Sequence, residues 1–86
     1  MGRKNRWFFS SDFRRKKEEL KLYLCHSIKR VVRKRNWNQR EAAFRMGTTA
    51  SRVSHVDRLK LNKLTIKQLF QYLINIAPHF EILIST

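Results

Sequence analysis

The sequence contains few residues that interrupt helices and strands or form crosslinks: one cysteine, one proline and two glycines among 86 residues. The lone Cys25 excludes an intrachain disulfide, and its apolar neighbours indicate a small buried side chain. Scarce proline and glycine, with 42% hydrophobic residues, argue against a disordered tail and favour one compact, helix-rich domain. A chain this short buries only about 60% of the surface that its unfolded form exposes. A partner or a second copy would therefore add useful stability.

Long apolar runs are missing too. No stretch of about 18 apolar residues could cross a membrane. The basic start lacks the apolar segment and cleavage site of a secretory signal. Residues 1–11 contain Arg and Ser but no acid, so an organelle transit peptide is the one targeting alternative left open.

Acidic residues are few, and this imbalance indicates the kind of partner. Six Asp and Glu stand against twenty Lys and Arg, a formal charge of +14. The mutual repulsion of so many positive charges destabilises the folded state unless a polyanion neutralises them. Residues 1–40 hold fourteen basic and three acidic residues, net +11, whereas residues 41–86 hold six and three, net +3. Nucleic acid is the first candidate partner and an anionic membrane surface the second.

The residues needed for catalysis or metal binding are not grouped. The acids are scattered, no nucleophile has a paired base at a recognisable spacing, and there is no glycine-rich phosphate loop. Adjacent Cys25 and His26 would point about 100° apart on a helix, and no second pair stands at ligand spacing. We expect no catalytic residue, no metal site, no cofactor and no enzymatic activity.

Apolar residues at steps of three and four predict the first helix. The pattern runs from Leu20 to Val32 and places the helix from residue 15 to about residue 35, with Lys21 and Lys29 largely away from the apolar stripe. Residues 1–14 show no such period, so we interpret them as a basic arm before a domain over residues 15–86. The basic residues assigned to the arm are Arg3, Lys4, Arg6, Arg14 and Arg15.

Capping signals predict three further helices. Asn38, with Glu41 three residues later, forms a capping box, and Gly47 ends that helix after little more than two turns. Thr49 caps the next helix, and a second box at residues 65–68 opens a fourth. Each helix therefore has its own start signal.

An alternating segment follows Pro78. Phe80, Ile82 and Ile84 share one face, which predicts a short strand. A single strand has no partner within the chain. We expect it to pair with the same strand of a second subunit, antiparallel about a two-fold axis.

Two short capped helices around a glycine turn form the helix-turn-helix pattern. The run "WNQREAAFRMGTTASRVSHV" resembles the helix-turn-helix of lambda-repressor-like, or XRE, transcriptional regulators. Extended through "KLNKLTIKQLFQYLINIAPHFEILI", it is similar to the compact subgroup that includes HigA-like antitoxins and ends in a short strand. The resemblance covers roughly residues 20–84. It implies a mainly α fold: a four-helix lambda-repressor-like DNA-binding domain with a C-terminal β-strand pairing across a dimer.

The resemblance also implies where DNA would be contacted. Its base-facing positions hold Ala50, Ser51 and His55, and Arg52 would point at a base or at the flanking phosphate. Gln39 corresponds to a residue that usually holds phosphate, and a helix N-terminus favours an anion there in any family. Further expected phosphate contacts are Arg33, Lys34, Arg35, Arg40, Thr49, Arg58, Lys60, Asn62 and Lys63.

The sequence departs from the family pattern at three positions. Ala50 stands where many relatives have Gln, so a bidentate adenine contact is missing. Leu59 occupies the place of a helix-ending Gly, and Asp57 that of an apolar residue. We expect base readout to be modest and to lean partly on DNA shape.

By this resemblance the protein is a homodimeric, sequence-specific transcriptional regulator, a repressor or an activator, that binds an inverted repeat in double-stranded DNA. It would work in the cytoplasm, associated with the nucleoid. An antitoxin that also binds a toxin protein is an alternative within this interpretation. A structural RNA-binding or ribosome-associated protein is the alternative from another class, because the charge and a basic arm that carries Trp7, Phe8 and Phe9 also suit RNA. Membrane binding by residues 13–35 is the weakest interpretation, since the small core needs that apolar face.

Overall fold

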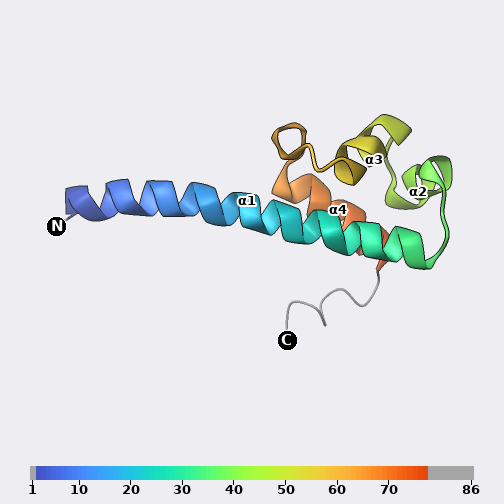
Figure 1. The fold of residues 1–86 in the computed structure, drawn as a ribbon, viewed down its shortest axis with the longest axis horizontal. Helices are drawn as coiled ribbons and strands as arrows, with labels where there is room; N and C mark the ends of the chain where they lie inside the picture. The colour runs from blue at the N-terminus through green and yellow to red at the C-terminus, as the bar shows by residue number, and fades with distance from the viewer. Residues whose placement is uncertain (1, 78–86) are drawn as a thin grey trace.

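The computed structural model describes the backbone of residues 2–77 and the side chains of residues 13–77. This part of the chain is helical, and Figure 1 shows three shorter helices gathered against the second half of a long one, whose first half projects beyond them. The molecule is correspondingly elongated, with extents of 51 × 28 × 16 Å. In chain order the elements are α1 (Gly2–Lys34), α2 (Gln39–Met46), α3 (Ala50–Asp57), the 3-10 turn η1 (Leu61–Lys63) and α4 (Ile66–Ile76).

Helix α1 begins at Gly2, well before the start near residue 15 that the apolar period predicts. The described part of residues 1–14 is thus helical and continuous with the domain. The apolar stripe located only the packed part of α1. Beyond it, each added residue needs only to extend an existing helix, which requires no core contact and is not opposed by proline.

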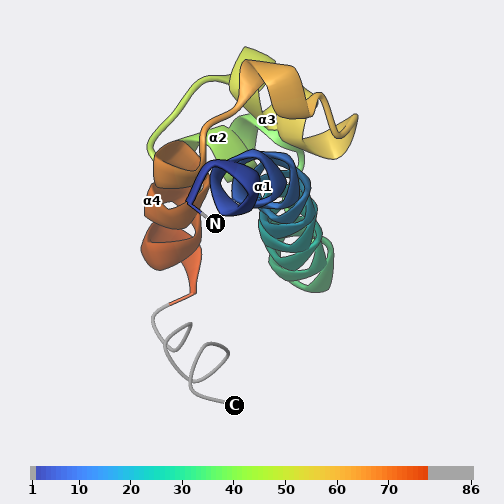
Figure 2. The same ribbon diagram turned by 90° about the vertical axis from the view of Figure 1, so that its left-hand side faces the viewer.

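The core forms where the second half of α1 meets the other helices. Figure 2, a view turned by 90°, shows α4 beside α1 and the α2–α3 pair above it. Cys25 is fully buried there, as predicted, whereas Leu20 is 37% exposed although the sequence placed it on the core face. The buried apolar residues are Leu24, Cys25, Ile28, Ala42, Ala43, Met46, Val53, Val56, Leu64, Leu69, Tyr72, Leu73 and Ile76.

The predicted starts of α2, α3 and α4 are confirmed. Asn38 Oδ1 accepts from the N–H of Glu41 at 2.8 Å, although the Glu41 carboxylate accepts from Arg45 Nε at 2.6 Å. Thr49 Oγ1 accepts from the N–H of Arg52 at 3.3 Å. At α4 the box over residues 65–68 is reciprocal, with both bonds at 3.1 Å. These bonds satisfy backbone donors that a helix start leaves unpaired.

Helices α1, α2 and α3 end in the same way. The residues after them, Asn36, Gly47 and Leu59, have φ values of 58°, 74° and 57°. In each case the next N–H reaches back five residues to a helix carbonyl, with bonds of 3.1, 2.9 and 2.9 Å in chain order. This is the Schellman termination, in which a left-handed residue turns the chain away from the helix axis. Gly47 was predicted to end its helix.

The predicted dimerisation strand, with Phe80, Ile82 and Ile84, lies outside the described residues. Residues 2–77 contain no strand. Among the helices described, none combines the length and apolar character that a membrane span requires.

Candidate nucleic-acid interface

Helix α4 holds the corner between α2 and α3. Asn75 Nδ2 donates to the carbonyl of Met46 at 2.9 Å, and Thr48 Oγ1 donates to Tyr72 Oη at 3.2 Å. A Cβ on Gly47 would lie 3.2 Å from the amide nitrogen of Asn75, in addition to being strained by the left-handed backbone. The angle between α2 and α3 is therefore fixed by hydrogen bonds to α4 as well as by the turn itself.

Helix α3 presents one face to the core and the other to solvent. Val53 and Val56, three residues apart, are buried. Of the predicted base-facing residues, Ala50, Ser51 and Arg52 are exposed and His55 is half-buried. The N-terminal turn of α3 is thus the most accessible part of the helix, which is the part that reaches base edges when a recognition helix enters the major groove.

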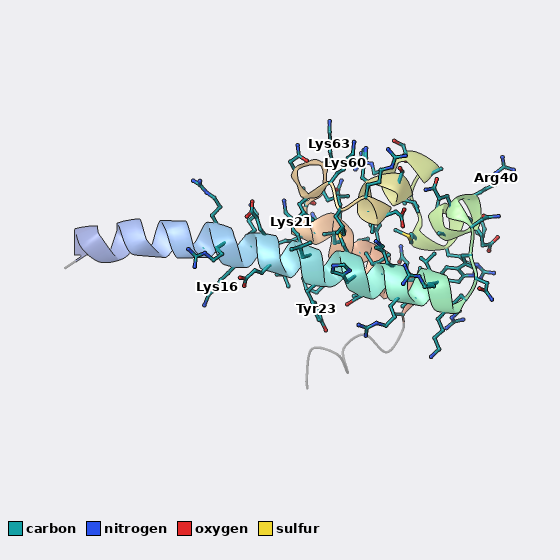
Figure 3. The ribbon with its side chains drawn as sticks, viewed as in Figure 1. Lys16, Lys21, Tyr23, Arg40, Lys60 and Lys63 are labelled. Carbon is teal, nitrogen blue, oxygen red and sulfur yellow. The ribbon has the colours of Figure 1, made fainter. Side chains whose placement is uncertain are left out.

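Basic residues flank α3 on the same side of the molecule. Figure 3 shows Arg40, on α2, and Lys60 and Lys63, around η1, pointing outward on the side where α3 lies, with Lys16 and Tyr23 of α1 on the opposite side. These residues come from elements 20 positions apart in sequence, and in this view Arg40 lies on one side of α3 and Lys60 and Lys63 on the other. The other predicted phosphate contacts of this region are exposed as well: Gln39, Thr49, Arg58 and Asn62.

The basic end of α1 has a different setting. Arg33, Lys34 and Arg35 are all exposed. The Arg35 guanidinium stands 5.9 Å from the centroid of the Trp37 ring, whose other neighbour is Arg45 at 5.5 Å. These distances fit cation–π contacts. Arg35 is therefore partly engaged in the α1–α2 turn.

The residues assigned to the basic arm form two groups, according to whether the structure describes their side chains. Arg14 and Arg15 are exposed on α1. Arg3, Lys4 and Arg6 belong to the helical backbone of α1, but their side chains lie outside the described part. Their role in binding stays a prediction.

Two lysines that the sequence placed away from the apolar stripe instead tie α1 to the helix-turn-helix unit. Lys29 Nζ donates to the carbonyl of Asp57, the last residue of α3, at 3.0 Å. Lys21 Nζ donates to the carbonyl of Leu61 in η1 at 3.1 Å, and both lysines are half-buried. The Asp57 carbonyl stands at the end of α3, where carbonyls lack partners within the helix and carry partial negative charge, so a cation suits it. The Leu61 carbonyl also accepts the N–H of Leu64, at 3.1 Å. No sequence motif marks an acceptor of this kind.

Phe44 was also missed. It is 79% exposed on α2, one turn after Arg40. The buried side of α2 consists of Ala42, Ala43 and Met46, and this spacing leaves Phe44 on the outside. Phe44 is thus an exposed apolar side chain on the same helix as Arg40.

Two short capped helices at a fixed corner, the second exposed and flanked by cations, define the class of helix-turn-helix proteins. Comparison with family models agrees: the model described as a helix-turn-helix domain matches residues 10–85. The chain belongs to that helix-turn-helix domain family. Searches of curated proteins and of solved structures each found no match to the chain.

Within the described residues, no group of three or more His, Cys, Asp or Glu side chains could hold a metal ion. The exposed residues on and around α3 offer hydrogen-bond donors, cations and helix termini. Such groups suit a polyanion with readable base edges.

Proposed function

We propose that the protein is a sequence-specific, DNA-binding transcriptional regulator of the XRE type that acts as a homodimeric repressor on an inverted repeat. The observation that carries this proposal is the exposed N-terminal turn of α3, held on a corner fixed by α4 and flanked by Arg40, Lys60 and Lys63. A helix about 10 to 12 Å across fits the major groove of B-DNA. The proposed site of action is the nucleoid.

In this proposal α3 reads the bases. Arg52 is the side chain that can make a bidentate contact, most readily with guanine. Ser51 and His55 add hydrogen-bonding groups, and Ala50 offers a methyl group to a thymine methyl. Only one of the four is a strong base reader, so DNA shape contributes part of the selectivity.

The flanking residues hold the phosphates. Gln39 and Arg40 open α2, where free backbone N–H groups and the helix dipole favour an anion. Lys60 and Lys63 would contact the DNA phosphates on the other side of α3. Contacts of this kind set the register of a protein on the duplex but carry no sequence information.

A two-fold dimer would place two α3 helices in successive major grooves, about 34 to 36 Å apart. The proposed contact between subunits is the strand over Phe80, Ile82 and Ile84. The antitoxin role and the RNA-binding alternative depend on the resemblance and the charge, and no contact among the described residues favours either of them over DNA repression.

The test is selection of bound duplexes from a random DNA library, followed by competition binding. Arg52→Ala should relax the preference at one position of each half-site, with a loss of about 1 to 3 kcal/mol for the preferred base. Lys63→Ala is the matched control: it should weaken all duplexes equally, since a phosphate contact is independent of sequence. An Arg52→Ala protein that selects the same sequence with undiminished preference would disprove the assignment of α3 as the recognition helix.

A further inference from the structure

A groove lies between α1 and the helix-turn-helix unit. Its volume is about 410 Å³. The apolar side chains that line it come from three places: Ile28 and Val32 of α1, Trp37 of the α1–α2 turn, and the buried faces of α2 and α3, including Met46 and Val56. The groove therefore adjoins the α3 helix from the side opposite to its solvent face.

The charged residues of the groove are two cations and one acid, and two amides, Asn36 and Asn38, also line it. Lys29 and Arg33, one turn apart on α1, line it, and Asp57 is the one acidic residue in its lining. Lys29 Nζ is held 3.0 Å from the Asp57 carbonyl oxygen, which is an uncharged acceptor. A ligand carboxylate would be a stronger acceptor for that ammonium group, because charge-assisted bonds are about twice as strong as neutral ones.

The size of the groove decides which class of partner fits. Small-molecule sites have volumes of about 300 to 1,000 Å³. A volume of about 410 Å³ falls in the lower part of that range. An apolar body with one anionic group matches both the volume and the charge.

We propose that this groove binds a small aromatic carboxylate, with the ring system against Trp37 and Val32 and the carboxylate on Lys29 and Arg33. Binding of this kind would make the protein responsive to a metabolite. The carboxylate would draw Lys29 away from the Asp57 carbonyl and so release the bond that joins α1 to the end of α3. This regulatory consequence rests on the proposed DNA-binding function, whereas the binding site itself does not.

The first experiment measures binding without DNA. The chain has two tryptophans. In a Trp7→Phe background the emission therefore comes from Trp37 alone and can be titrated with 1-naphthoate and with its uncharged analogue 1-naphthamide. We expect saturable quenching by naphthoate, at least fivefold weaker binding of naphthamide, and NMR shifts at the methyl groups of Ile28, Val32 and Val56.

Variants locate the site. Lys29→Gln and Arg33→Gln should each weaken naphthoate binding at least fivefold, and Val32→Phe, which fills the groove, should abolish it. Arg30→Gln is the matched control, because Arg30 is exposed on α1 and does not line this groove. Thermal unfolding followed by circular dichroism confirms that each variant is folded. Equal binding of naphthoate and naphthamide, or equal losses in Arg30→Gln and Arg33→Gln, would overturn the proposal.

The second experiment repeats the titration in the presence of selected duplex DNA. Naphthoate should lower the affinity for DNA at least fivefold, within the usual range of coupling between sites, and DNA should lower the affinity for naphthoate by the same factor. Naphthoate binding without DNA binding would refute the proposed function and leave the groove proposal standing. DNA binding without any naphthoate binding would refute the groove proposal alone, and two independent affinities would overturn the regulatory part of it.

Discussion

Three single residues, Asn36, Gly47 and Leu59, decide how the helices are connected. All three take the left-handed conformation, which costs an ordinary L-residue about 1 to 2 kcal/mol. Asn and Gly tolerate it, whereas Leu59 is an unfavourable residue type that also packs against the core. The helix-turn-helix corner uses glycine, and there the neighbouring Asn75 amide adds a steric reason to the conformational one.

We expect Gly47→Ala to lower the free energy of unfolding by about 1 to 2 kcal/mol, because alanine is strained at φ 74° and its Cβ crowds Asn75. Urea denaturation followed by circular dichroism measures the change. Asn36→Gly is the control at an equivalent helix end and should change stability by less than about 0.5 kcal/mol. An unaltered denaturation midpoint in Gly47→Ala would contradict the role given to this corner.

The buried thiol of Cys25 makes stability dependent on pH in the alkaline range. Burial, opposed in part by Lys29 and Lys21, raises the pKa of Cys25 from 9.0 to about 11. The folded chain then keeps a proton that the unfolded chain has lost, so this contribution is complete below pH 9 and disappears as the pH rises through about 11.

The loss from Cys25 should amount to about 2 to 3 kcal/mol across that range. It is measured as the difference in unfolding free energy between the parent chain and Cys25→Ala at pH 8, 9.5 and 11, since lysine titration affects both. A difference that stays constant with pH would show that the thiol titrates normally in the folded state. In agreement with the raised pKa, Cys25 should react with thiol reagents at pH 8 only through unfolding.

At the scale of elements, α1 serves two purposes. Its second half supplies Leu24, Cys25 and Ile28 to the core, and its first half projects beyond the other helices. The projecting part is basic and buries nothing in the core among its described side chains, 13–20. We therefore assign it to binding and expect stability to depend on it only weakly.

Deleting residues 2–14 tests this division. The variant should fold with nearly the same denaturation midpoint but bind every duplex more weakly, with a smaller salt dependence because basic residues are lost. The measurement is fluorescence anisotropy with specific and scrambled duplexes at several salt concentrations. Affinity equal to that of the full chain would refute a role of this segment in phosphate binding.

The elements could be predicted from the sequence to the extent that their signals are local. Caps such as Asn38, Thr49 and Thr65 act within four residues, so their helices were located closely. The start of α1 was wrong because helix extension beyond the core leaves no apolar pattern. The bonds of Lys21 and Lys29 reach over 40 and 28 residues to backbone carbonyls, and a carbonyl is the same in every residue. The candidate interface was predicted from family resemblance, whereas the groove behind it requires the packed structure.

At the scale of the whole molecule, charge dominates the expected behaviour. A net charge of +14 on a body only 51 Å long gives a strong field with a cationic face around α3. If six to ten basic side chains of a dimer meet phosphates, raising the salt from 50 to 200 mM should lower DNA affinity by about 10³- to 10⁵-fold. Titration at four salt concentrations measures the slope. A shallow slope, equivalent to one or two phosphates, would be incompatible with the interface assigned above.

The way in which α3 is attached to the rest of the domain affects which substitutions the protein can accept. Both lysine ties from α1 end on main-chain carbonyls, of Asp57 and Leu61, and Asn75 likewise holds the carbonyl of Met46. None of these three attachments depends on which side chains α3 carries on its outer face. Residues such as Ala50, Ser51 and Arg52 can therefore be exchanged while the support of the helix stays intact. Under the proposed function, new target sequences would become accessible by substitution at a few exposed positions, without any need to rebuild the domain.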